Sequence, residues 1–226
     1  MKYKNILWDW NGTILNDTPV AFEATNTLLK RYDYPTITLE FYRDNMDTPI
    51  ENFYSKIFDL NKHDMQMLDD EWVCLYHQLS NKIGLHNGVV TLLNFFAAEN
   101  CRQVVLSAFK TEEITKYARK FSVEHFFDSI LGTQNIVMES KTARGTRYMQ
   151  EHGFAPDHTL YIGDTVHDCD TARDLGVDCI LFSGGQQSPK LLQQCGMPIF
   201  KDFTSIKKYI AKTKGNINEG LKMDFL

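Results

Sequence analysis

The sequence predicts an α/β fold: a doubly wound, Rossmann-like parallel sheet that is interrupted after its first strand by an all-helical insertion. Three observations support this prediction. A short apolar run at 5–8 is followed by Asp9 and an Asn-Gly turn signal. Helical periodicity then dominates residues 17–83. From Gly88 onward, apolar strands alternate with helical stretches, as in a parallel sheet whose two faces are covered by helices.

The insertion is predicted to contain three helices. The first begins with Thr18 as its N-cap and Pro19 as its first helical residue. The second begins at a capping box formed by Thr48 and Glu51 and continues through an apolar run, and the third covers 65–79. Aromatic and methionine side chains at helical spacing are expected to form the core of this insertion rather than a ligand cage. These residues are Phe53, Tyr54, Phe58, Met65, Trp72 and Tyr76.

The prediction divides the chain into two parts. Residues 1–14 and 86–226 form the α/β core, and residues 15–85 form a helical cap that, at roughly seventy residues, exceeds an ordinary loop. Within the core, three further strands are expected, at 103–106, 159–162 and 177–182.

Composition excludes several classes of protein. The 24 Lys and Arg residues against 29 Asp and Glu give a formal charge of −5, which provides no basic field for a nucleic-acid backbone. The five cysteines form no C-x-x-C pair and are odd in number, so we expect reduced thiols and a cytoplasmic location. No apolar run is long enough for a membrane helix or a signal peptide. A monomer and a homodimer fit equally well.

Polar residues at the ends of strands indicate where a site would form. In an open parallel sheet, ligands bind beyond the carboxyl ends of the strands. The first strand ends in Asp9 within DWNGT, the second in Ser107 within VVLSA, and a later one in Asp164 within YIGDTVHD. Lys141 opens the helix before that last strand. Each residue alone has a local explanation as a turn or cap residue, but their order and spacing together favour a functional site.

This order of Asp-x-Asn-Gly-Thr, Ser, Lys and Gly-Asp-x-x-x-Asp resembles the four-motif signature of the haloacid dehalogenase-like hydrolase superfamily. The resemblance extends from Lys4 to Gly185, and the helical insertion falls where phosphoglycolate phosphatase-like members carry their small cap. It implies a phosphoric monoester hydrolase that depends on Mg²⁺ and acts on a small-molecule phosphoester.

The resemblance also implies how phosphate would be bound and attacked. The Asp9 carboxylate would attack phosphorus in line and form an aspartyl-phosphate, which divides one difficult displacement into two easier steps. Ser107 and the backbone N–H of Ala108 would hold phosphoryl oxygens. Lys141 would neutralise charge on the nucleophile and on the phosphate together.

A metal site is implied beside the nucleophile. Mg²⁺ would be held by the Asp9 carboxylate, the backbone carbonyl of Asn11, Asp164, the substrate phosphate and waters. Asp168, one helical turn after Asp164, would either orient this site from behind or ligate directly, and we favour the outer position. His167 is expected to line or cap the loop rather than to bind metal.

One position departs from the phosphatase pattern. Asn11 stands where phosphatases of this superfamily carry a second Asp, which gives a proton to the leaving group and later takes one from water. A carboxamide cannot carry a proton near neutral pH, and loss of a general acid-base costs about 10² to 10⁴ in rate. Deamidation at Asn11-Gly12, giving an active minority form, is a further hypothesis.

Three accounts of the function follow from that departure. A slow or selective phosphatase is the account that we favour. A non-catalytic phosphate-ligand sensor or pseudo-enzyme is the alternative. A phosphonate hydrolase is disfavoured, because Ile50 stands where such relatives carry a Schiff-base lysine.

Substrate selection is expected from the cap, which would close over the core and exclude water. The segment 43–49 is predicted to be a turn that contacts the substrate. Within it, Arg43 would pair either with a substrate carboxylate or, as we favour, with the nearby Asp44 or Asp47.

Overall fold

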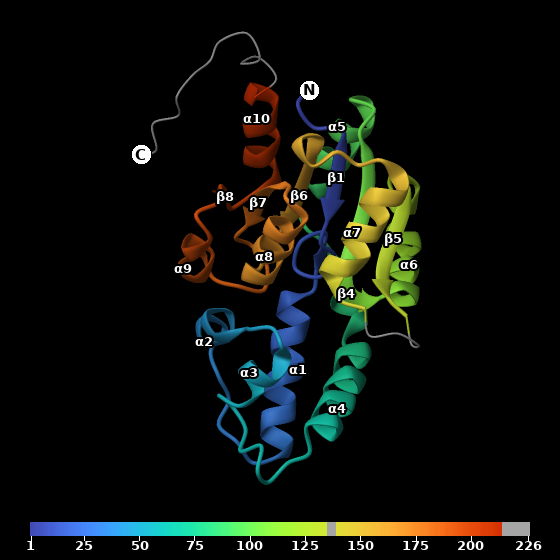
Figure 1. The fold of residues 1–226 in the computed structure, drawn as a ribbon. Coiled ribbons are helices and arrows are strands. Elements are labelled where there is room, and N and C mark those ends of the chain that lie inside the picture. Colours follow the sequence, from blue (N-terminus) through green and yellow to red (C-terminus); the bar gives the residue numbers. More distant parts are fainter. Residues whose placement is uncertain (135–138, 214–226) are drawn as a thin grey trace.

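The computed structural model describes residues 1–134 and 139–213. Within these residues, a six-stranded parallel sheet has the order β5-β4-β1-β6-β7-β8 (Figure 1), which confirms the predicted doubly wound fold. The end of the predicted core, residues 214–226, lies outside the described residues. The strands are β1 (Asn5–Trp8), β4 (Arg102–Lys110), β5 (Ser129–Thr133), β6 (Thr159–Gly163), β7 (Asp178–Phe182) and β8 (Ile199–Phe200).

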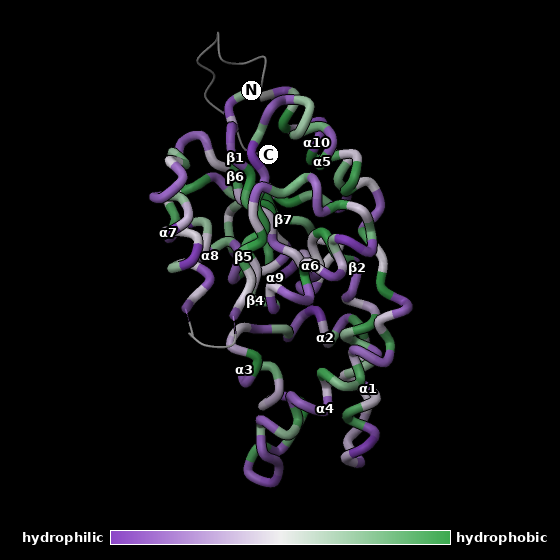
Figure 2. Tube along the Cα trace, turned by 90° about the vertical axis from the view of Figure 1, so that its right-hand side faces the viewer, coloured by the Kyte–Doolittle hydropathy of each residue, from purple (hydrophilic) through white to green (hydrophobic). Residues whose placement is uncertain are grey.

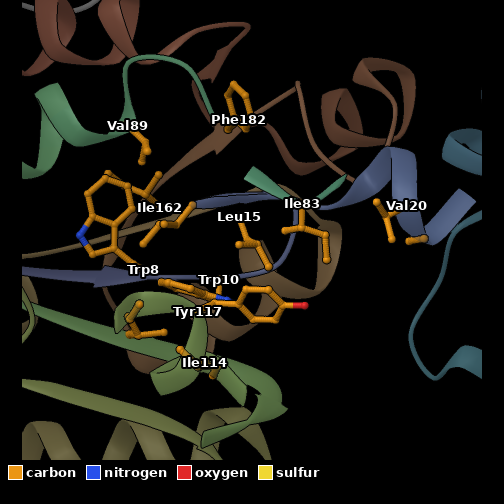
Figure 3. Packing of buried hydrophobic residues seen from close by; sticks show 14 of the residues in the cluster. Trp8, Trp10, Leu15, Val20, Ile83, Val89, Ile114, Tyr117, Ile162 and Phe182 are labelled. Carbon is orange, nitrogen blue, oxygen red and sulfur yellow. The ribbon is translucent and has the colours of Figure 1, made fainter. Parts of the chain in front are cut away.

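Helices cover both faces of the sheet because successive strand residues point to opposite faces. Ile6 and Trp8 of β1 belong to one apolar cluster, and Leu7 belongs to the other. Figure 3 shows Trp8 and Ile162 close to Val89 on the first face. The first cluster includes residues of α5, α6 and α10, and the second includes residues of α7 and α8. These helices are α5 (Val89–Ala98), α6 (Thr111–Lys120), α7 (Lys141–His152), α8 (Val166–Leu175) and α10 (Phe203–Thr213).

Hydropathy follows this layering. In Figure 2 the chain around β6 and β7 is largely hydrophobic, whereas much of the outer chain is hydrophilic. Short helical segments complete the connections between the main elements. They are η1 (Ser80–Lys82), η2 (Glu124–Phe126), η3 (Pro156–His158), α9 (Pro189–Leu192) and η4 (Gln193–Cys195).

The helical insertion lies between β1 and α5 and extends away from the sheet (Figure 1). Its entering and leaving segments run side by side, because β2 (Leu15–Asn16) pairs antiparallel with β3 (Gly84–Leu85). This ladder falls at the predicted limits of the cap, although the division into domains stays a prediction. The helices of the insertion are α1 (Thr18–Arg31), α2 (Leu39–Asn45), α3 (Ile50–Tyr54) and α4 (Met65–Gln78).

The start of α1 differs from the prediction by one residue. Asp17, not Thr18, is the N-cap, and Pro19 is the second helical residue. The helix begins earlier because the backbone carbonyl of Asp17 already accepts hydrogen bonds from the N–H groups of Val20 and Ala21, both at 2.9 Å. The Asp17 side chain makes no cap hydrogen bond, which leaves its carboxylate available to other groups.

The predicted capping box of Thr48 and Glu51 does not form. Pro49 is the N-cap of α3, and no side chain caps this helix. The Asp47 carboxylate instead accepts hydrogen bonds from the Thr48 N–H at 2.8 Å and from Asn52 Nδ2 at 3.2 Å. A neighbouring acid therefore organises the segment that the box was predicted to organise.

Two helices of the insertion differ in extent from the prediction. Helix α3 ends at Tyr54, and the chain continues in a turn in which the Phe58 N–H donates to the Tyr54 carbonyl at 2.8 Å. The sequence does not predict α2, where the Thr38 side chain accepts a hydrogen bond from the Phe41 N–H at 3.0 Å. The predicted turn at 43–49 is wrong in its first part, because it begins inside this helix.

The second predicted strand is longer than expected. Strand β4 continues to Lys110, but its pairing with β5 shifts register between Leu106 and Lys110. Ser107 therefore marks the point where regular pairing ends, not the end of the strand. The sequence does not predict β5 or β8, the two edge strands.

The predicted core of the insertion is confirmed in its main residues. Phe53, Tyr54, Phe58 and Tyr76 are buried in the larger apolar cluster, and Trp72 packs against it, as does Met65. Trp72 and Tyr76 also line a cavity, so these two side chains have a second environment besides the core.

Candidate active site

Three neighbouring strands bring the predicted site residues together. Because β4, β1 and β6 are adjacent, Ser107, Asp9 and Asp164 meet beyond the same edge of the sheet. A cavity of about 370 Å³ opens there between the core and the insertion. Asp164 is fully buried and is not part of the lining. The predicted site residues that line the cavity are Asp9, Asn11, Ser107, Ala108, Lys141 and Asp168.

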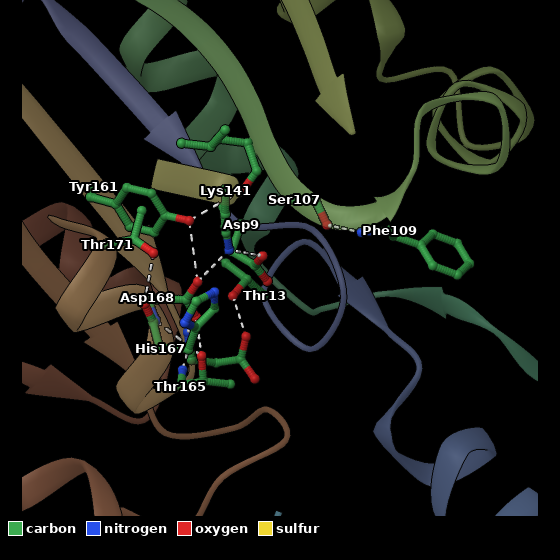
Figure 4. A network of polar contacts seen from close by, with 12 residues as sticks. Asp9, Thr13, Ser107, Phe109, Lys141, Tyr161, Thr165, His167, Asp168 and Thr171 are labelled. Atoms are coloured by element: carbon green, nitrogen blue, oxygen red, sulfur yellow. Dashed lines mark hydrogen bonds and ion pairs between the residues drawn. The ribbon is translucent and has the colours of Figure 1, made fainter. Parts of the chain in front are cut away.

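Lys141 lies between two carboxylates. Ser140 caps α7 by accepting a hydrogen bond from the Ala143 N–H at 3.1 Å, which makes Lys141 the first helical residue. Its Nζ donates to Asp9 Oδ1 at 2.7 Å and to Asp168 Oδ1 at 2.6 Å (Figure 4). Burial alone lowers the pKa of Lys141, but the two carboxylates outweigh this effect and raise it. The ammonium is therefore a fixed positive charge.

Besides its contact with Lys141, Asp168 fixes the start of α8. It forms a capping box with Thr165, whose N–H and Oγ1 donate to Asp168 Oδ2 at 2.9 and 2.7 Å. The Asp164 N–H donates to the same oxygen at 3.0 Å, and Tyr161 OH donates to the other at 3.2 Å. Burial raises the pKa of Asp168, but Lys141 and these hydrogen bonds have the larger, opposite effect. The net pKa is below its usual value, so the carboxylate is ionised.

Asp164 is enclosed by the loop that follows β1. Its Oδ1 accepts a hydrogen bond from Thr13 Oγ1 and its Oδ2 accepts one from the Gln186 N–H, both at 2.6 Å. Gly12 has a φ of +76°, and a Cβ there would lie 2.3 Å from Asp164 Oδ2. The close approach of this loop therefore requires glycine. Burial, followed by the charge of Asp9, raises the pKa of Asp164.

The three carboxylates form a compact acidic group that fits a metal ion. Asp9, Asp164 and Asp168 each offer an oxygen within 4.8 Å of the others, and all three are buried. Burial, followed by the charge of Asp168, raises the pKa of Asp9 to about 7 in spite of Lys141. Two unit charges about 4 Å apart repel by about 4 kcal/mol at an effective dielectric constant of 20. One ammonium cannot balance three carboxylates, and a divalent cation with oxygen ligands can.

Asp17 is a site residue that sequence reasoning missed. Its buried carboxylate accepts hydrogen bonds from the Gly12 N–H at 2.8 Å, from Asn11 Nδ2 at 2.7 Å and from Tyr76 OH at 2.8 Å. Burial raises its pKa. Its only signal in the sequence is its position six residues after Asn11. The N–H groups of Ile14 and Leu15 donate to the Trp10 carbonyl, so the loop folds back and brings Asp17 beside Asn11.

Arg43 lies elsewhere than predicted. Its guanidinium donates to the backbone carbonyls of Ser183 and Gln187 in the core, the latter at 3.1 Å. It has no ion pair with Asp44 or Asp47 among the described residues, and it does not line the cavity. Arg43 therefore joins the insertion to the core.

The insertion supplies the opposite wall of the cavity. His167 lies on the core side, and burial together with Lys141 lowers its pKa. The predicted segment 43–49 contributes through two residues other than Arg43. The lining residues contributed by the insertion are Asp17, Ala21, Tyr42, Met46, Thr48, Ile50, Asp69, Trp72 and Tyr76.

The family of the chain follows from comparison with known proteins. The model of the haloacid dehalogenase-like hydrolase family matches residues 6–182, and the chain belongs to this family. No curated protein matches the chain. In the described residues, no helix is both long and apolar enough to span a membrane.

Solved structures share the fold at low sequence identity. A haloacid dehalogenase-like hydrolase from Streptococcus pneumoniae is 19% identical with a TM-score of 0.80, covering 92% of this chain and 99% of its own. A predicted phosphoglycolate phosphatase from Haemophilus somnus is 20% identical with a TM-score of 0.76, covering 93% and 99%. A predicted phosphatase from Clostridium acetobutylicum is 17% identical with a TM-score of 0.74, covering 94% and 100%.

Proposed function

We propose that the chain is a Mg²⁺-dependent hydrolase of small-molecule phosphomonoesters that works through an aspartyl-phosphate on Asp9. The observation that carries this proposal is the position of Asp9. Its carboxylate lies in the cavity lining, 2.7 Å from the buried Lys141 Nζ. Membership of a hydrolase family and the likeness to predicted phosphatases support the same reaction class.

The reaction has two displacements at phosphorus. An Asp9 oxygen forms a bond to phosphorus while the bond from phosphorus to the ester oxygen breaks, and the leaving oxygen takes a proton from solvent water. Water then attacks phosphorus and releases Asp9 and inorganic phosphate. Ser107, the Ala108 N–H and Lys141 hold the phosphoryl oxygens through both steps.

Metal binding is proposed at the acidic group. Asp9, Asp164 and the backbone carbonyl of Asn11 would hold Mg²⁺, which would neutralise the charge between nucleophile and phosphate. Both oxygens of Asp168 are already engaged by Lys141, Tyr161 and backbone N–H groups. These contacts support the outer position for Asp168.

Asn11 limits the rate of this reaction. Its amide donates to Asp17, and it cannot give a proton to the leaving alcohol. A slow phosphatase, or one selective for good leaving groups, fits this arrangement. The same residue favours the second candidate, a phosphate-ligand sensor without turnover. A cytoplasmic location and a monomeric or homodimeric state stay predictions.

Phosphate release tests the proposal. We would assay p-nitrophenyl phosphate and a panel of small phosphomonoesters, with Mg²⁺ and with chelator, for the natural protein, Asp9→Asn and Asn11→Asp. Magnesium-dependent release that Asp9→Asn abolishes is the expected result. Tight binding of phosphate mimics with no release from any ester would favour the sensor. Peptide mass spectrometry of position 11 would decide whether a deamidated minority is the source of activity, because activity that does not follow the deamidated fraction rules this out.

A further inference from the structure

The two ends of the cavity have opposite chemistry. The core end carries the charged groups described above. The wall from the insertion is largely apolar and aromatic, and it contains two carboxyl groups. That of Asp17 is engaged by hydrogen bonds from Asn11, Gly12 and Tyr76, and that of Asp69 lies near the aromatic side chains. This wall would face the alcohol portion of a phosphoester whose phosphate lies beside Asp9.

The aromatic side chains of this wall are fixed by hydrogen bonds. Trp72 Nε1 donates to Thr25 Oγ1 at 3.1 Å, and the indole ring stacks on Tyr76 with centroids 5.2 Å apart and planes at 24°. Tyr42 OH donates to Gln186 Oε1 at 3.0 Å. These ring faces therefore need little rearrangement to receive a ligand.

Asp69 precedes Trp72 by three residues on α4, so the two side chains lie on the same face of the helix. It is half-buried and lines both this cavity and an adjoining pocket of about 60 Å³. Within residues 1–134 and 139–213, its carboxylate accepts no hydrogen bond and has no ion-pair partner within 4.0 Å. Burial and the neighbouring acids Asp70 and Glu51 raise its pKa, which reflects the lack of a cation in contact with it.

The described residues supply no positive charge at this end of the cavity. Lys141 is held at the core end, and Arg43 is bound to core carbonyls. Lys110 acts on Asp69 electrostatically but is exposed and does not line the cavity. A substrate carboxylate, such as that of phosphoglycolate, would find no counter-charge here and would be repelled by Asp69.

We propose that the wall from the insertion binds an organic cation, so that the preferred substrate is a phosphomonoester of an alcohol that bears a quaternary or protonated amine. The inference rests on the proposed phosphatase function. A cation over the faces of Trp72 and Tyr76 is attracted by the negative face of each ring. The Asp69 carboxylate adds a charge of the complementary sign at the rim of the same wall.

A pair of esters of equal shape tests the inference. Choline phosphate and 3,3-dimethylbutyl phosphate differ only by a nitrogen in place of a carbon, so their kcat/KM ratio reports the positive charge. The charge also makes choline the better leaving alcohol, and the change of the ratio on Asp69→Asn separates this effect from contact with the wall. We expect choline phosphate to be preferred by about 10-fold, and phosphoglycolate to be poorer than both. Asp69→Asn should lower the ratio several-fold, and the preference that remains would come from the rings of Trp72 and Tyr76 and from the better leaving group.

Asp70→Asn is the matched control. It removes the same charge one residue away on α4, where the exposed Asp70 carboxylate accepts a hydrogen bond from Gln66 Nε2 at 2.9 Å. The ratio should keep its natural value in this variant. A ratio near one in the natural protein, or a preference for phosphoglycolate, would overturn the cation inference and leave the phosphatase proposal standing.

Calorimetry keeps the inference testable if no ester is hydrolysed. That result would overturn the proposed function, and the two isosteric esters would then be compared as ligands of the natural protein with Mg²⁺. Binding of choline phosphate about 10-fold tighter than its neutral isostere would support the cation site. Equal affinities would overturn it.

Discussion

The two ends of one cavity are built on different principles. At the core end, Lys141 is held between Asp9 and Asp168, and backbone groups fix the carboxylates. At the end formed by the insertion, aromatic rings surround Asp69, which has no ion-pair partner among the described residues. From this difference we infer that the core end would carry out the reaction and that the end formed by the insertion would choose among substrates. Substitution of Asp9 should therefore lower the rate for every ester alike, whereas substitutions in the wall from the insertion should change the ratio between esters that differ in the charge of the alcohol.

The largest effect is expected from Asp9→Asn. Loss of the nucleophile should lower kcat by about 10⁴-fold or more for every ester alike, since individual nucleophiles have effects of this size. Asp170→Asn, an exposed acid of α8 paired with Arg173, is the control and should retain full rate. If Asp9→Asn lowered kcat by different factors for different esters, the core end would also take part in choosing among substrates.

Lys141→Met should have the next largest effect, on stability. It leaves Asp9 and Asp168 buried without their counter-ion, and breaking a buried ion pair costs about 3 to 5 kcal/mol. Urea denaturation without metal would measure the free energy of unfolding. Added Mg²⁺ should recover part of the loss. An unchanged free energy of unfolding would mean that the three carboxylates are not ionised together.

The pair Asn11 and Asp17 offers a finer test of the core end. The double variant Asn11→Asp with Asp17→Asn keeps an amide-to-carboxylate contact but moves the carboxyl group to the usual position of the acid. We expect kcat for alkyl phosphates to rise by about 10²-fold, and less for p-nitrophenyl phosphate, whose leaving group needs no proton. Asn11→Asp alone places two carboxyl groups in contact and should gain less. No gain for any alkyl ester in the double variant would contradict the role assigned to position 11.

The core end was predictable and the other end was not, for a physical reason. Asp9 and Asp164 follow β1 and β6, and Ser107 lies where regular pairing of the neighbouring β4 ends, so the parallel order of these strands brings the three residues to one edge of the sheet. The positions of Asp17 and Asp69 depend instead on how a turn returns and how helices pack. No local pattern encodes either.

The sequence was also a poor guide to where helices begin, because this depends on which polar side chain makes the capping contact. Asp47 and Thr38 make the hydrogen bonds that organise α3 and α2, and the sequence alone does not show which of several neighbouring polar residues will do so. Arg43 illustrates the consequence, because its partners lie about 140 positions further along the chain. Sequence reasoning considered a substrate carboxylate and the acids beside it, not the backbone carbonyls of the core.

The smallest predicted effect is the pH dependence of stability that comes from His86, a residue outside the cavity lining. His86 packs against Phe182 with ring centroids 4.8 Å apart, and burial lowers its pKa to about 4. The unfolded chain takes up this proton near pH 6.5 and the folded chain does not, so stability present above pH 6.5 is lost as the pH falls toward 4. His86→Gln should lower the slope of stability against pH in this range by about 1 kcal/mol per pH unit, measured by urea denaturation. An unchanged slope would assign the acid sensitivity to other groups.

Trapping the phosphorylated enzyme would show directly whether Asp9 is the nucleophile. The protein would be mixed with substrate and Mg²⁺, quenched within one turnover and reduced with borohydride, which converts an aspartyl-phosphate to homoserine. We expect homoserine at position 9 and at no other position. No homoserine should form when chelator replaces Mg²⁺. Phosphate release that proceeds while Asp9 stays unreduced would contradict it, because water would then attack the ester without a covalent intermediate.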